Sequence, residues 1–141
     1  MSQGSMETGS HKPAGWPNRL LRWLFGLTFI FAAPNHYLQV IQDPPMPPAA
    51  AMFHHALTAS GYIFQLVVAA EFAGGVLLIT GAWMPFALIL LAPVIANIFC
   101  FHLFLAPGGL PVAAILVIAE LILAWQYRNS FRPLFSMGAQ G

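Results

Sequence analysis

Charged residues are scarce in this sequence. Asp, Glu, Lys and Arg make up 6% of its 141 residues, whereas they make up roughly a quarter of a soluble globular domain. Hydrophobic residues make up 59%, and the mean hydropathy is +0.75. A chain this apolar is typical of a polytopic membrane protein of one domain. The net charge of +1, without a basic block, gives no sign of a nucleic-acid partner.

Cysteine is nearly absent as well. Cys100 is the single cysteine, and it stands inside an apolar run. One cysteine cannot form an internal disulfide, a CxxC redox pair or a cysteine-based zinc site. This excludes the thiol enzymes that reduce quinones within small helical bundles. Flavin, nucleotide and iron–sulfur motifs are also missing from the sequence, so we expect neither a metal site nor a covalent cofactor.

Long apolar runs predict four membrane-spanning helices, at 19–42, 61–82, 84–106 and 109–129. Each run has about 20 mostly apolar residues, enough to cross a hydrocarbon core of about 30 Å. The loop at 43–60 opens with DPPMPP, which cannot be regular helix. It continues as AAAMFHHALTAS, which predicts a short outer-side helix on the membrane surface or over the bundle. The predicted fold class is an all-α integral membrane protein with a four-helix transmembrane bundle.

Lysine and arginine occur only before or early in the first predicted helix and near the end of the fourth or after it. Lys12, Arg19 and Arg22 precede the apolar core of the first helix, and Arg128 and Arg132 follow the fourth. The positive-inside rule then places both termini in the cytoplasm, and the even number of spans agrees. We expect a polar tail at 1–17, a four-helix membrane domain at 18–135 and a second tail at 136–141.

Two glutamates stand in the middle of long apolar runs, Glu71 in AAEFAGGVLLI and Glu120 in VIAELILAW. A carboxylate in hydrocarbon is costly unless it is paired, protonated or next to water. At 1.5 Å of rise per residue, both carboxyls are about 15 Å from the outer ends of their helices. They are therefore expected near mid-membrane. The alternative is that both are neutral acids that bond across helices for structure alone.

Four further polar residues are expected in the outer half of the bundle, namely Asn35, His36, Asn97 and His102. At the same rise per residue, His36 is about 21 Å above Arg22 along the helix axis. We predict one polar, cofactor-binding site made of these four side chains and both carboxyls. The histidines and asparagines also have a purely structural alternative. Histidines can donate hydrogen bonds to backbone carbonyls, and asparagines can form hydrogen bonds between helices. Asn97 and His102 are about 140° apart around their helix and cannot both face the bundle centre.

Five stretches of the chain resemble the DoxX-like family of small bacterial membrane proteins. They are LLRWLFGLTFIFA, PPMPPAAAMF, GYIFQLVVAAEFAGGVLLITG, LAPVIANIFCFHLFLAPGGLP and AELILAWQYRNSFRPLF. The resemblance implies a four-helix protein of the bacterial inner membrane. The family is named after a small subunit of a thiosulfate:quinone oxidoreductase, and its relatives accompany redox or stress-response proteins. It brings no catalytic motif, and Ala33-Pro34 departs from the family's usual glycine after the alanine.

The first functional hypothesis is an integral membrane subunit of a larger quinone-linked redox complex of respiratory type. The bundle would supply a hydrophobic cavity for a quinone, because quinone chemistry needs proton donors beside an apolar slot. His36, His102 and the two carboxyls are the candidate partners of the headgroup. Electrons would come from another subunit, so we do not expect catalysis by this chain alone.

Three alternatives remain open. A scaffold or accessory subunit of a respiratory or photosynthetic assembly would use the polar residues only to hold the bundle together. Haem or chlorophyll could take His36 and His102 as axial ligands, although two histidines are weak support. A small-solute transporter fits the mid-membrane carboxyls, but four helices must oligomerise to enclose a pathway. The expected partners are otherwise membrane subunits and the lipid bilayer.

Overall fold

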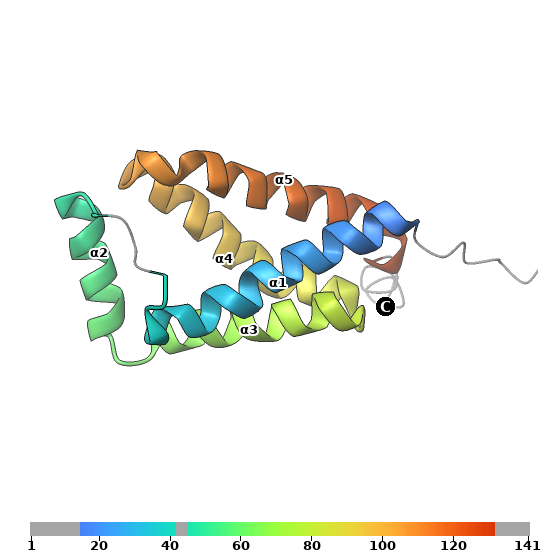
Figure 1. Ribbon diagram of the computed structural model, residues 1–141, viewed down its shortest axis with the longest axis horizontal. Helices are drawn as coiled ribbons and strands as arrows, with labels where there is room; N and C mark the ends of the chain where they lie inside the picture. The colour runs from blue at the N-terminus through green and yellow to red at the C-terminus, as the bar shows by residue number, and fades with distance from the viewer. Residues whose placement is uncertain (1–14, 42–44, 132–141) are drawn as a thin grey trace, which may run out of the picture.

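The structure, a computed structural model, describes residues 15–41 and 45–131. These residues form five α-helices and one 3₁₀ turn, with no strand among them (Figure 1). The elements are α1 Trp16–Leu38, α2 Pro48–Ala59, α3 Ile63–Thr80, α4 Met84–Phe104, η1 Pro107–Gly109 and α5 Leu110–Gln126. The predicted short helix in the loop is confirmed as α2. Of the two predicted tails, residues 1–14 and 136–141 lie outside the described part of the chain.

The first helix begins at Trp16 rather than Arg19 and ends at Leu38 rather than Gln42. Pro17 stands in its first turn, where the missing N–H costs no helical hydrogen bond. At the other end Gln39 has a left-handed φ of 48°, and its N–H donates to the carbonyl of Asn35. This turn ends the helix one turn earlier than the apolar pattern predicts.

The four long helices alternate in direction, so that α1 lies antiparallel to α3, α3 to α4 and α4 to α5 (Figure 1). The start of α1 and the end of α5 share one end of the bundle, which we call the terminal end. There Nη1 of Arg22 donates to the hydroxyl of Tyr127 at 3.5 Å. The opposite end holds α2, which stands across the ends of the long helices, and we call it the α2 end.

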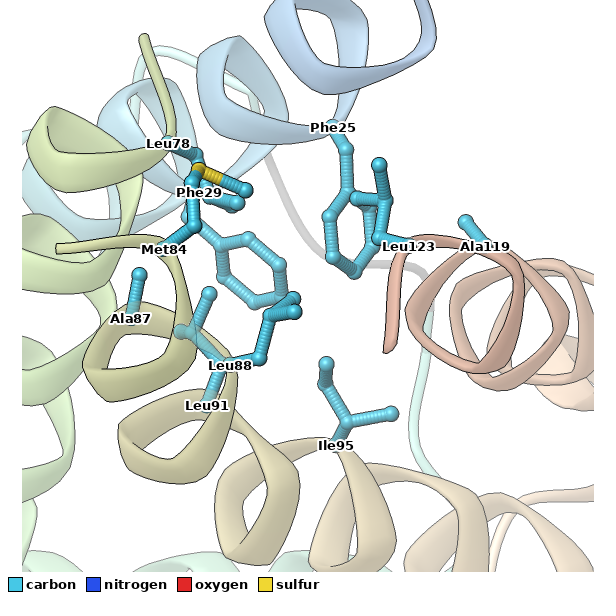
Figure 2. Packing of buried hydrophobic residues seen from close by; sticks show 10 residues of the cluster. All are labelled: Phe25, Phe29, Leu78, Met84, Ala87, Leu88, Leu91, Ile95, Ala119 and Leu123. Carbon is cyan, nitrogen blue, oxygen red and sulfur yellow. The ribbon is translucent and has the colours of Figure 1, made fainter. Parts of the chain in front are cut away.

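The hydrophobic core gathers side chains from α1, α3, α4 and α5 (Figure 2). It consists of Phe25, Phe29, Leu78, Met84, Ala87, Leu88, Leu91, Ile95, Ala119 and Leu123. Phe25 and Phe29 pack edge to face, with ring centroids 5.2 Å apart. Met84 opens α4 and Leu78 lies in the last turn of α3, so this core lies toward the terminal end. In Figure 1 the α1–α3 pair and the α4–α5 pair diverge toward the α2 end.

Three helical segments are long and apolar enough to cross a membrane, at Ile63–Thr80, Met84–Phe104 and Pro107–Gln126. The described part of α1 is not among them, since it carries two arginines, Asn35 and His36 within its 23 residues. Large apolar side chains such as Leu66, Phe86 and Ile118 are exposed on the outer faces of the three apolar helices. These faces contact the lipid bilayer.

Candidate functional site

His36 on α1 and Glu71 on α3 form a pair at the α2 end of the bundle. Nε2 of His36 lies 3.2 Å from Oε2 of Glu71, within hydrogen-bond distance. The Glu71 side chain is 5% exposed and that of His36 is 33% exposed. The carboxyl is therefore enclosed by the helices while the imidazole reaches the surface of the site.

The antiparallel packing of α1 on α3 explains how these two residues meet. His36 lies in the last turn of α1, whereas Glu71 lies roughly two turns into α3. Each Cα–Cβ bond tilts toward the N-terminus of its own helix. His36 therefore leans back toward the terminal end and Glu71 leans toward the α2 end. The two side chains together span the difference in depth between the backbone positions of His36 and Glu71.

A pocket of about 580 Å³ opens beside His36. Its walls come from the end of α1, the loop before α2, α2 itself, the end of α4 and η1. They are lined by His36, Pro45, Met46, Pro47, His54, Phe101, His102, Ala106, Gly108 and Gly109. Ligand pockets of this kind are mostly apolar with a few polar groups that orient the ligand. Here the side-chain polar groups are three imidazoles.

His102 reaches the pocket from the last turn of α4. Its Nδ1 lies 3.0 Å from the carbonyl oxygen of Ala106, just beyond the end of the helix, so Nδ1 carries the proton that this bond needs. Its ring packs edge to face on Phe101 at 5.2 Å. Gly109 makes room for the ring, because a Cβ atom there would overlap its Cε1. The bond to Ala106 leaves Nε2 as the ring atom that can accept a hydrogen bond from a ligand.

His54 is a site residue that was not among the six predicted ones. It half-buries its ring on the pocket side of α2, while the neighbouring His55 is exposed. The ring of Phe64 packs edge to face with both His36, at 5.2 Å, and His54, at 5.6 Å. The spacing of Ala50, His54 and Leu57 marks one face of a helix, and this signal could have separated His54 from His55.

The structure brings together three of the six predicted site residues, namely His36, Glu71 and His102. Asn35 points elsewhere: its Nδ2 donates to the carbonyl of Ile41 at 3.0 Å, and its Oδ1 accepts from the Ile41 N–H at 2.9 Å. Asn97 lies on an exposed face of α4. Glu120 belongs to a different hollow, between α4 and α5.

The pocket can bind a ligand whose polar atoms lie on an otherwise apolar frame. Imidazole nitrogens donate or accept according to tautomer, and the Glu71 carboxyl can exchange a proton with His36. Among the described residues, no group of three or more histidine, cysteine or acidic side chains is placed to hold a metal ion. Imidazole groups beside an enclosed carboxyl are suited to hydrogen bonding and proton exchange with a bound ligand.

Comparison with known proteins gives one match. A family model described as DoxX matches residues 19–105, which include most of α1 and all of α2, α3 and α4. Both members of the His36–Glu71 pair and the imidazole of His102 lie within this range. Neither the curated proteins nor the solved structures contain a match to the chain.

Proposed function

The chain belongs to the DoxX family, and from this premise we propose that it is a membrane subunit of a quinone-linked redox complex. In this proposal the bundle supplies the quinone pocket and a partner subunit supplies the electrons. The observation that carries it is the pocket of about 580 Å³ with three imidazoles, one of them paired with the enclosed carboxyl of Glu71. The multi-pass membrane architecture of the chain fits a lipid-soluble ligand.

The size and lining of the pocket suit a quinone headgroup. Small-molecule sites usually enclose about 300–1,000 Å³ and combine apolar walls with a few placed polar groups. Pro45, Met46 and Phe101 offer apolar and aromatic surface for a ring. A quinone carries carbonyl oxygens on opposite sides of its ring, and these accept hydrogen bonds from imidazole N–H groups. The hydroxyls of the quinol form can instead donate to an imidazole nitrogen without a proton, such as Nε2 of His102. His36, His54 and His102 would hold the headgroup from different helices.

The His36–Glu71 pair suits the proton side of quinone chemistry. Reduction of a quinone to a quinol takes up protons together with electrons. The redox change would take place on the bound quinone, and the protein side chains would handle only the protons. An imidazole at the pocket surface can pass a proton to or from a ligand oxygen. Glu71 behind it can take up the imidazole's other proton or return one, so His36 need not carry a lasting charge in an apolar site.

We infer the membrane orientation from the charge distribution and from the end of the bundle that the start of α1 shares with the end of α5. Arg22 and Tyr127 meet at the terminal end, and Arg19 and Arg128 belong to the same end of the bundle. The positive-inside rule places this end in the bacterial cytoplasm. We propose that α1 is the fourth span, with its apolar core between Trp23 and Ala33. The α2 end, with its pocket, then lies at the outer surface of the inner membrane.

The test is gentle detergent extraction of the native membrane, followed by mass spectrometry of the proteins and lipid-soluble molecules that co-purify. Redox subunits and a quinone are expected together. His36→Leu is expected to lose the quinone while the subunits remain, because the substitution removes one side of the pocket. His55→Leu is the matched control, since it removes an exposed imidazole on the same helix as His54 and is expected to retain the quinone.

Three results would redirect the proposal. A stable assembly with no quinone in the wild-type protein would leave this chain as a scaffold subunit. Purification with neither redox subunits nor quinone would remove both roles and favour transport through an oligomer. Equal quinone retention in His36→Leu and the wild type would move the binding site away from this pocket.

A further inference from the structure

A groove between α4 and α5 forms a second hollow in the bundle, separate from the His36 pocket. It has a volume of about 290 Å³ and is lined by Ala92, Ile95, Ala96, Phe99, Cys100, Val117, Glu120 and Leu121. Ala92, Ala96 and Cys100 follow one another at four-residue spacing, so they form one stripe along α4. All three are exposed. Small side chains at this spacing let another membrane helix approach closely.

Glu120 supplies an unpartnered polar atom at this groove. The residue is 8% exposed, and its Oε2 is buried without a hydrogen-bond partner among the described residues. Within a bilayer no bulk water is available to satisfy such an atom. The carboxyl of Glu120 therefore requires a donor from outside the described fold, and the groove is where that donor can enter.

Asn97 supplies an unpartnered donor beside this groove, about 60° around α4 from Cys100, which lines it. It follows Ala96 directly on α4, its side chain is exposed, and it forms no hydrogen bond with the described residues. An amide carries two N–H donors and one acceptor, and in lipid it seeks a partner on another helix. Because Ala96 and Glu120 line the same groove, Asn97 and Glu120 lie at similar depth in the bundle.

We propose that the α4–α5 groove binds a second copy of this chain, with Asn97 of one protomer donating to Glu120 of the other. Two copies with the same membrane orientation are related by a two-fold axis along the membrane normal. Under that axis each residue meets residues of its own depth. Each protomer brings one donor and one acceptor to the interface, so two symmetry-related hydrogen bonds form in each dimer. The small-residue stripe lets the two α4 helices approach closely enough for these bonds.

This self-association does not depend on quinone binding. The groove and the pocket at the α2 end share no lining residue. A dimer could therefore form whether or not the pocket is occupied, and its failure would leave the proposed function intact. Conversely, a dimer without quinone would support this inference alone.

The sole cysteine of the chain makes the test direct. Cys100 belongs to the stripe and is exposed, and a disulfide forms only when the two Cα atoms approach to roughly 4–7 Å. In membranes treated with a mild oxidant or a short thiol linker, Cys100 is expected to cross-link to Cys100. In a Cys100→Ala background, Ala92→Cys and Ala96→Cys are expected to restore cross-linking. Ile115→Cys is the control, since it lies about 160° around α5 from Val117 and the groove.

Blocking variants complete the test. Ala96→Phe fills the stripe and is expected to lower the dimer fraction about tenfold, measured by photobleaching steps in dilute vesicles. Asn97→Leu is expected to weaken the dimer, whereas Ile115→Phe, equally bulky but outside the groove, is expected to leave it unchanged. Cross-linking at Ile115→Cys as strong as at the stripe, or none at any of the three stripe positions, would overturn the proposal. A purely monomeric chain bound to a different membrane protein through this groove would overturn it as well.

Discussion

Gly26 on α1 and Gly75 on α3 face each other across the two helices, backbone against backbone. A Cβ atom on Gly26 would lie 2.9 Å from the carbonyl oxygen of Gly75, and one on Gly75 would lie 2.8 Å from the carbonyl oxygen of Gly26. Real Cβ atoms do not approach carbonyl oxygens so closely. The two glycines thus set the spacing of α1 and α3, on which the meeting of His36 and Glu71 depends.

Gly75→Ala is expected to destabilise the bundle by about 1–3 kcal/mol, the usual cost of overpacking a close contact. The methyl group would meet backbone atoms of α1, which can yield only if the whole helix shifts. The measurement is the free energy of unfolding in mixed micelles. Gly108→Ala is the matched control, because no atom lies within 4 Å of a Cβ built there. Equal stability of the two variants would contradict the close approach.

Glu71→Gln is expected to keep the fold, at a cost below about 1 kcal/mol. The amide is close in size to a neutral carboxylic acid and can still bond to Nε2 of His36. Glu71→Leu removes this hydrogen-bond partner of His36 and is expected to cost more, about 1–3 kcal/mol. The unfolding free energies of both variants in mild detergent give the comparison. If the glutamine variant lost the folded bundle, the carboxyl would be ionised and paired rather than neutral.

The helices were predictable from the sequence because their signals are local. Apolar runs of helical length, bounded by prolines and glycines, placed α3, α4 and α5 to within a few residues. The end of α1 was less predictable, since it depends on the two bonds from Asn35 to the backbone of Ile41. Apolar periodicity carries no signal of such a side-chain turn.

For the site, the position of each residue along its helix was predictable, but the direction in which its side chain points was not. Depth along each helix, counted at a fixed rise per residue, predicted His36 and His102 near one end of the bundle, and both line the pocket at the α2 end. Counting residues cannot, however, supply the rotation of each helix in the bundle. That rotation turned Asn97 outward on α4 and sent Glu120 to the groove with Ala96. The position of α2, which brings His54 to the pocket, also depends on tertiary contacts alone.

Gly109→Ala is expected to disturb the pocket without unfolding the bundle. The backbone of Gly109 has a φ of −92°, which alanine adopts without strain. The added methyl group would overlap the ring of His102, so the ring must move and lose its bond to the carbonyl of Ala106. Co-purified quinone is expected to fall about tenfold, the effect of one lost hydrogen bond.

The readout for this variant is quinone per mole of protein, with helical content measured beside it. Gly15→Ala, just before α1 and outside the pocket lining, adds a methyl group whose one contact is Pro17 Cδ at 3.5 Å, and it is expected to leave both quantities unchanged. If Gly109→Ala retained its full quinone content with His102 displaced, His102 would not be a headgroup contact.

Asn35→Ala is expected to loosen the end of α1 while leaving the core intact. The substitution removes both hydrogen bonds to Ile41, and each such bond contributes about 1 kcal/mol. Exchange of the Ile41 amide hydrogen is expected to accelerate about tenfold or more, since its bond to the side chain closes this turn. Asn35→Asp keeps the acceptor for that N–H and is expected to exchange at an intermediate rate. Amide exchange followed by mass spectrometry makes the comparison, with Leu78 in the core as an internal reference. If Leu78 accelerated as much as Ile41, Asn35 would support the whole bundle rather than the turn that leads into the pocket.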